Sequence, residues 1–77
     1  MIEFENVTVI HDASRRMLVD NLGETEVILE RQDGVAWPVN LLPDRRIRVN
    51  NYEGHPLQVR VLDGGPGKVR VQPLGAT

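Results

Sequence analysis

The chain has 77 residues and a mass of 8.7 kDa, which is room for one small domain with a marginal core. It has no cysteine, so disulfides and thiolate metal sites are excluded. No apolar run approaches the ~20 residues that span a membrane, and residues 1–5 lack the cationic start of a signal peptide. We therefore expect a single β domain over residues 1–77, cytoplasmic or virion-associated, with no membrane partner.

The net charge of −2 is divided unevenly along the chain. Residues 1–40 carry three arginines against eight carboxylates, whereas residues 41–77 carry six Arg and Lys residues against three carboxylates. Such a division indicates either a charged partner or contact between the acidic part of one copy and the basic part of another.

The first half of the chain predicts short strands separated by turns. Residues 2–10 are rich in β-branched and aromatic side chains, and their apolar phase changes across Glu5-Asn6, as an inserted bulge residue would cause. The next expected elements are a turn at 11–15, a strand at 16–20, a turn at 21–24 and a strand at 25–31. Asp33-Gly34 is typical of a tight hairpin turn, and Pro38 confines the strand at 35–41 to a sheet edge or a bulge.

The second half begins after a break at Pro43-Asp44 and also predicts strands alone. These strands cover 46–52, 56–62 and 68–72, with a turn at 53–54 and a glycine-rich loop at 63–67. No segment has apolar residues at helical spacing over eleven positions, so the fold class is all-β. We expect a small barrel or sandwich of six to seven short antiparallel strands, because closure protects strand edges.

A repeat within the sequence suggests how these strands are grouped. A shift of forty places Val7, Val9, Met17, Val19 and Leu22 on Ile47, Val49, Leu57, Val59 and Leu62, and two extra loop residues bring Val27 and Leu29 onto Val69 and Val71. Alternating strands resemble one another by default, so the repeat is compatible with duplication or with chance. Either way it favours two three-strand meanders, at about 2–31 and 46–74, joined by the 31–45 segment, of which 32–45 is the connector proper.

Period-two alternation places five cations and no carboxylate on the outer face of the second meander. These are Arg46, Arg48, Arg60, Lys68 and Arg70. Like charges on neighbouring strands repel, so this face indicates an anionic partner or a solvated surface that discourages edge pairing. Tyr52, at the end of the same meander, is the residue best placed to stack on a base.

The same alternation turns three aliphatic side chains outward in the first meander. Ile10, Leu18 and Ile28 would form one patch bordered by Glu26 and Glu30. A contiguous apolar patch is typical of a subunit or partner interface. The alternative is that the 31–45 segment, with Trp37 and Leu42, folds over it.

Catalytic and cofactor motifs are not indicated. His11, Asp12 and Ser14 are the residue types of a hydrolytic triad, but neighbours in one turn cannot place an imidazole between a hydroxyl and a carboxylate. His11 and His55 lack the close spacing of zinc ligands. The run Gly64–Lys68 lacks the first glycine, the Ser or Thr and the following helix of a phosphate-binding loop. We expect no metal, no cofactor and no enzymatic activity.

The sequence therefore predicts a non-catalytic protein–protein interaction or assembly module, such as a small structural or accessory subunit of a larger complex or virion. Its partner would be another protein or a second copy of the chain. The alternative is a nucleic-acid-binding or regulatory small β-barrel, similar to OB or SH3 folds, that uses the basic face of the second meander.

Overall fold

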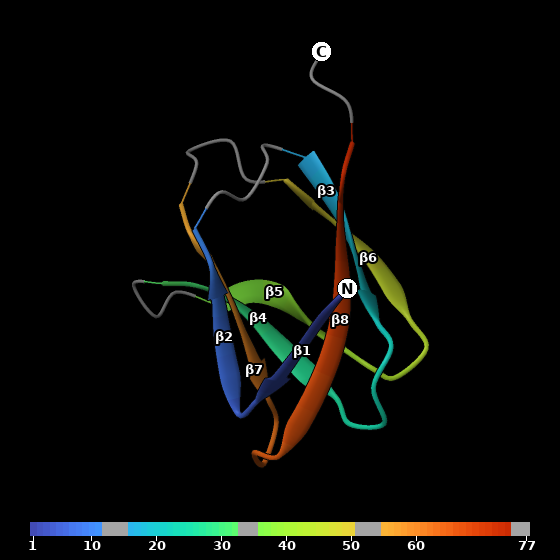
Figure 1. The fold of residues 1–77 in the computed structure, drawn as a ribbon. Helices are drawn as coiled ribbons and strands as arrows, with labels where there is room; N and C mark the ends of the chain where they lie inside the picture. The colour runs from blue at the N-terminus through green and yellow to red at the C-terminus, as the bar shows by residue number, and fades with distance from the viewer. Residues whose placement is uncertain (12–15, 33–35, 51–54, 75–77) are drawn as a thin grey trace.

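The computed structural model describes residues 1–11, 16–32, 36–50 and 55–74, with the backbone alone described for 36–39 (Figure 1). This part of the chain forms eight strands and no helix, which confirms the all-β class. The strands are β1 (Ile2–Glu5), β2 (Val7–Ile10), β3 (Arg16–Asn21), β4 (Val27–Arg31), β5 (Ala36–Leu41), β6 (Arg46–Asn50), β7 (Leu57–Val61) and β8 (Pro66–Pro73). Across the described ranges no helix is long and apolar enough to traverse a membrane.

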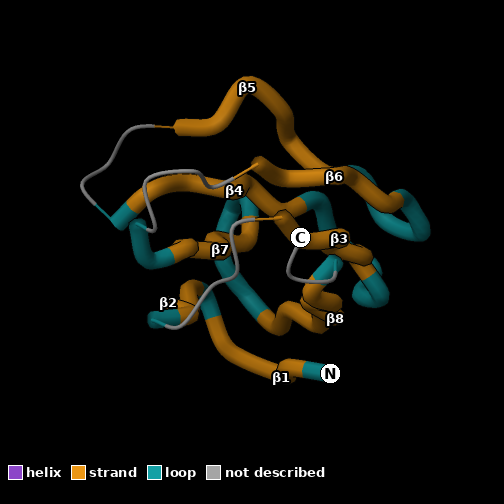
Figure 2. The backbone as a smooth tube through the Cα atoms, turned by 90° about the horizontal axis from the view of Figure 1, so that it is seen from above, coloured by secondary structure: helices purple, strands orange, loops and turns teal. Residues whose placement is uncertain are grey.

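The strands form two antiparallel four-stranded sheets that enclose one core (Figures 1 and 2). Sheet A has the order β1-β8-β3-β6, and sheet B has the order β2-β7-β4-β5. The core draws fully buried side chains from both sheets, among them Met17, Val19 and Val69 of sheet A and Leu29, Leu57 and Val59 of sheet B. The expectation of a small barrel or sandwich is therefore confirmed. The described part of the chain has eight strands instead of the expected six to seven, because the strand expected at 2–10 is divided into β1 and β2.

The two predicted meanders do not form. Each described strand pairing joins one of β1–β4 to one of β5–β8, and β4–β5 is the one described pairing between consecutive strands. The chain changes sheet at the other connections instead of turning back within a sheet. Period-two alternation distinguishes the inner from the outer face of a strand, but it does not specify which sheet the strand joins.

The repeat in the sequence appears in the fold as an approximate twofold relation. The counterparts are β1 and β5, β2 and β6, β3 and β7, and β4 and β8. Exchanging the two members of each pair converts the order of sheet B into the order of sheet A, read from β6 to β1. The main-chain hydrogen bonds follow the same rule. The Leu22 amide donates to the Lys68 carbonyl at 2.8 Å, and the Leu62 amide donates to the Glu26 carbonyl at 2.9 Å.

The inward and outward phase of most strands is as the sequence predicts. The odd-numbered apolar residues of β3, β4 and β7 are fully buried, as is Val69 of β8. Val49 of β6 is buried at 4% exposure. Strand β2 is the exception. Thr8 and Ile10 lie opposite the buried Val59 and Leu57, so they face the core, whereas Val7 is 45% exposed.

A corner at Asn6, rather than a bulge, explains the phase of β2. Asn6 has a φ of 60°, and its side-chain oxygen accepts a hydrogen bond from the Gly65 amide at 2.8 Å. The corner carries the chain from sheet A to sheet B, and the even-numbered Ile2, Phe4 and Ile10 all pack against the core. The prediction that Ile10 faces outward is therefore wrong.

Two local predictions for turns and edges are confirmed. Strand β5, which contains Pro38, is an edge strand of sheet B. Asp63, Gly64 and Gly65 all have positive φ, and a strand follows them. This loop crosses between the two sheets, because β7 and β8 do not pair. The Asp33-Gly34 turn lies outside the described residues.

Candidate functional site

The outer face of sheet A collects five cationic side chains on three adjacent strands, β8, β3 and β6. We call this set the basic face, and its members are Arg16, Arg46, Arg48, Lys68 and Arg70. The register orders them in rows across the sheet. One row runs Arg70, Asp20, Arg46, and the next runs Gln72, Leu18, Arg48.

Asp20 holds two of these arginines in place. Arg46 Nε donates to Asp20 Oδ1 at 2.6 Å, and Arg70 Nε donates to Asp20 Oδ2 at 3.2 Å. The Asp20 side chain is 9% exposed, whereas those of Arg46 and Arg70 are 54% and 48% exposed. The hydrogen bond from Arg46 lowers the pKa of Asp20 against the opposing effect of burial, and Arg70 lowers it further. The buried Asp20 carboxylate thus orients the two guanidinium groups, and both remain open to solvent on the outer face of sheet A.

The basic face carries more positive charge than its described carboxylates neutralise. Asp20 is shared between two arginines, and Lys68 Nζ reaches Glu3 Oε1 only at 3.8 Å. Among the residues that the structure describes, no carboxylate forms an ion pair with Arg16 or Arg48, and both side chains are exposed. The basic face therefore has a net positive charge among the described residues.

The centre of the basic face is apolar. Leu18 lies on the outer side of β3, directly opposite Arg48 on one neighbouring strand and Gln72 on the other. It is half-buried. An aliphatic centre surrounded by arginines is typical of a protein interface, where apolar contact lies inside a polar rim.

The structure brings together four of the five cations expected on one face. Arg46, Arg48, Lys68 and Arg70 share sheet A, and Arg16 joins them. Sequence reasoning missed Arg16 as a member because it assigned β3 to a different meander. Arg60 lies on sheet B, apart from the others. Tyr52 lies outside the described residues.

Arg60 is neutralised on the outer face of sheet B. Its Nη2 donates to Glu30 Oε1 at 2.9 Å, and Gln58 Nε2 donates to Glu30 Oε2 at 2.9 Å. The hydrogen bond from Arg60 lowers the pKa of Glu30 despite its burial. Glu26 accepts a hydrogen bond from Asn40 at 3.0 Å. Both glutamates of the predicted interface are therefore held by neighbours on their own sheet.

The apolar patch predicted from Ile10, Leu18 and Ile28 is not contiguous. Leu18 is on the outer face of sheet A, Ile28 is on the outer face of sheet B, and Ile10 packs against the core. Alternation alone assigns all three to neighbouring strands of one meander, and that meander does not form. Whether Leu18 or Ile28 contacts a partner stays a prediction.

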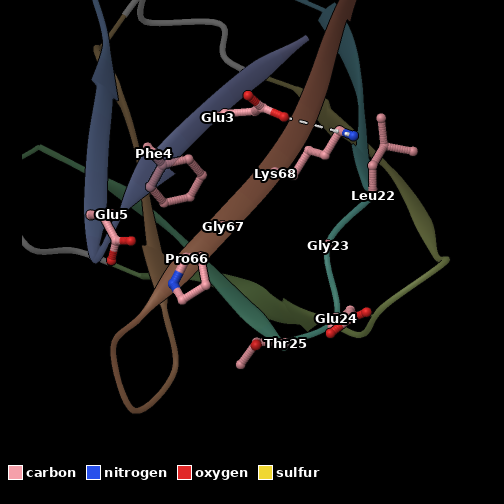
Figure 3. A pocket seen from close by; sticks show the side chains of 10 residues that line it. All are labelled: Glu3, Phe4, Glu5, Leu22, Gly23, Glu24, Thr25, Pro66, Gly67 and Lys68. Atoms are coloured by element: carbon pink, nitrogen blue, oxygen red, sulfur yellow. Dashed lines mark ion pairs between the residues drawn. The ribbon is translucent and has the colours of Figure 1, made fainter.

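An acidic depression lies beside β1, the end strand of sheet A that is opposite to β6 in the strand order (Figure 3). It has a volume of about 680 Å³ and is open to solvent. Glu3 and Glu5 border it from β1, and Glu24 borders it from the turn before β4. Lys68 is the cation in its lining. Sheet A therefore presents carboxylates at its β1 side and arginines at its β6 side.

The residues considered for catalysis and metal binding form no site in the described ranges. No group of three or more His, Asp or Glu side chains is arranged to hold a metal ion there. His11 is exposed and His55 is half-buried, while Asp12 and Ser14 lie outside the described residues. The absence of enzymatic activity stays a prediction.

No protein-family model, no curated protein and no solved structure matches this chain. Its surfaces are therefore the basis for assigning a function.

Proposed function

We propose that this protein is a non-catalytic interaction module that binds an acidic protein surface through the basic face, as a subunit of a larger assembly. One observation carries the proposal: Asp20 is a single buried carboxylate that orients Arg46 and Arg70, while Arg48 beside them has no described counter-charge. Fixed, solvent-open guanidinium groups bind carboxylates well because little side-chain freedom is lost on contact.

The apolar centre favours a protein partner. Leu18 lies between Arg48 and Gln72 on the basic face, and a partner that covers this face removes the side chain from water. Arginine is enriched at protein interfaces, where its stem packs and its head group pairs. Polyphosphate backbones would use the arginines but not the leucine.

Nucleic acid is the second candidate, since the same guanidinium groups could bind phosphates in two-point contacts. The described part of the basic face offers no aromatic side chain on which a base could stack. This candidate would therefore rely on backbone charge, and its affinity would fall log-linearly with salt concentration.

The test compares fluorescently labelled poly-glutamate with a labelled oligothymidylate of similar charge, each titrated with the protein at several salt concentrations. The variant is Arg48→Gln, and the matched control is Gln32→Glu, since each lowers the net charge by one and Gln32 follows β4 of sheet B. We expect Arg48→Gln to weaken poly-glutamate binding about tenfold and the control to change it little.

Equal effects of the two variants would contradict the proposal, because net charge rather than the basic face would then govern binding. Tighter binding of the oligonucleotide than of poly-glutamate, with the steeper salt dependence, would favour the second candidate.

A further inference from the structure

The two end strands of sheet A carry opposite charges. The outward side chains of β1 are Glu3 and Glu5, and those of β6 include Arg46 and Arg48. We propose that β6 of one copy pairs with β1 of a second copy, so that sheet A continues head to tail from molecule to molecule. This inference rests on the proposed function and concerns the β6 edge of the basic face, where it names another copy of this chain as an acidic partner.

The strand directions permit this pairing without turning the second copy over. Each neighbouring pair in the order β1-β8-β3-β6 is antiparallel, so β1 and β6 run in opposite directions. A copy displaced along the sheet with the same outer face therefore presents its β1 antiparallel to β6 of the first copy. The joined sheet keeps one outer face and one inner face throughout.

One register satisfies both faces of the joined sheet. If Arg48 lies opposite Glu3 of the second copy, Arg46 lies opposite Glu5, since antiparallel partners step in opposite directions. On the inner side, the same register places Ile47 opposite Phe4 and Val49 opposite Ile2. Val49 belongs to the core within its own copy, and the other three side chains pack against it. Opposite charges meet outside, and aliphatic or aromatic side chains meet inside.

In the described part of the chain, β1 and β6 each pair with another strand on one side only. β8 is the one strand that pairs with β1 there, and β3 is the one that pairs with β6. The Glu3 side chain is 75% exposed, and its 3.8 Å approach to Lys68 leaves one carboxylate oxygen directed away from that amine (Figure 3). An unpaired strand edge offers main-chain donors and acceptors to another chain.

The same charges prevent the alternative, symmetric contacts. Two β1 edges would set Glu3 and Glu5 against glutamates, and two β6 edges would set arginines against arginines. Like charges directly opposed across strands are destabilising. The association is therefore heterologous, and it produces a ring or an open filament according to the rotation between copies.

The contact is small, because β1 has four residues and β6 has five. Edge pairing of this length buries less surface than the roughly 1,200 Å² of a standard stable interface. We therefore expect weak association that depends on protein concentration and weakens in high salt, reinforced where a larger assembly aligns the copies.

The test is sedimentation velocity of the full chain from about 10 µM to about 1 mM, a range that spans weak association. The variants are Glu3→Arg, Arg48→Glu and the doubly exchanged chain carrying both changes. Glu24→Arg is the control for the net charge of Glu3→Arg, since Glu24 is exposed in the turn before β4 and lies on neither edge strand.

We expect wild-type protein and the Glu24→Arg control to associate with rising concentration, and each edge variant to need at least about fivefold more protein for the same average mass. The doubly exchanged chain and an equimolar mixture of the two single variants should recover association, because both restore opposite charges at the edge. A monomeric wild-type protein at all concentrations would overturn the inference, as would association that neither edge variant weakens.

The register has its own test, since the natural chain has no cysteine. A mixture of Glu3→Cys and Arg48→Cys chains should form an intermolecular disulfide on oxidation, because directly opposed residues have Cα atoms roughly 4.5–5.5 Å apart, which a disulfide can span. A mixture of Glu24→Cys and Arg48→Cys chains should not cross-link above background. Equal cross-linking of both mixtures would overturn the register.

Glu3→Arg also separates this inference from the proposed function. It reverses the charge at Glu3 on the β1 edge but leaves every arginine of the basic face, so binding of poly-glutamate should be retained or strengthened. If the wild-type chain is monomeric and still binds poly-glutamate through Arg48, the head-to-tail inference fails and the proposed function stands.

Discussion

Asn21 of β3 and Val61 of β7 occupy equivalent positions in the two sheets. Asn21 lies opposite Val69, Val61 lies opposite Val27, and both side chains are fully buried. At this pair of equivalent core positions, one sheet therefore has an amide side chain and the other has an aliphatic one. The amide has a defined purpose, because its Nδ2 donates to the carbonyls of Thr25 and Leu41 and its Oδ1 accepts from the Gly23 amide.

Replacing Asn21 by valine should destabilise the protein even though valine suits the equivalent position. Asn21→Val leaves three main-chain groups without their described partners, two carbonyls and one amide. A buried polar group that loses its hydrogen bond costs about 1–3 kcal/mol, so we expect the free energy of unfolding to fall by about 2–4 kcal/mol in urea titrations. Asn50→Val, on the exposed side of β6, is the control and should change it by less than about 0.5 kcal/mol. A wild-type midpoint for Asn21→Val would contradict this account of the site.

Gly67 should not tolerate a side chain, because the Phe4 ring occupies the space beside it. A Cβ at Gly67 would lie 2.5 Å from Phe4 Cζ and 2.8 Å from Val61 Cγ2. Gly67→Ala therefore requires the ring to move, and overpacking of this kind costs about 1–3 kcal/mol. Thermal unfolding should show a lowered melting temperature.

A double-mutant cycle with Phe4→Ala identifies the cause. If the ring is the obstacle, Gly67→Ala should cost less in the Phe4→Ala background than in the wild-type chain. Additive effects of the two changes would instead assign the loss to the contact with Val61 or to the main chain.

The all-β class, the position of most strands and the edge position of β5 could be predicted because they depend on local features. Alternation identifies the buried Met17 and Val19, and Pro38 cannot donate a hydrogen bond within a central strand. The pairing of strands could not be predicted, since it depends on which connections cross between the sheets. Asn6, with a φ of 60°, makes one such crossing, yet in the sequence it looks like a bulge.

The basic face could be predicted only in part for the same reason. The outward direction of Arg46, Arg48, Lys68 and Arg70 follows from their alternation with inward-facing aliphatic residues, and sheet A does bring them together. The loss of Arg60 to sheet B depends on pairings between residues far apart in the chain. So does the position of Asp20, which the sequence shows as one more outward carboxylate and the structure places between two arginines.

The stability of the protein should fall in acid because of Asp20 and Glu30. The pKa of each carboxyl is lower in the folded protein than its ordinary value, chiefly through hydrogen bonds from Arg46 and Arg60. The folded state therefore binds fewer protons than the unfolded state once the pH falls below about 5. The stabilisation by these carboxylates is complete above that pH and is lost as the pH falls through their lowered pKa values.

Substituting Asp20 by asparagine should flatten this pH dependence. Urea titrations at pH 7 and pH 3 should show a smaller loss of unfolding free energy for Asp20→Asn than for the wild-type chain, although the variant is already less stable at pH 7. Glu24→Gln removes an exposed carboxylate and should keep the wild-type dependence. An unchanged difference between the two pH values in Asp20→Asn would show that the Arg46 contact does not form in solution.

The interlaced pairing of the strands predicts that neither half of the chain folds alone. Each described pairing joins β1–β4 to β5–β8, so a fragment of residues 1–34 or 35–77 retains strands that have lost their neighbours. Circular dichroism should show each fragment unfolded and an equimolar mixture with the spectrum of the intact chain. Because the cut makes association bimolecular, the melting temperature of the mixture should rise with concentration. A fragment that unfolds cooperatively by itself would contradict the described pairing, since a self-contained half needs strand pairs within it.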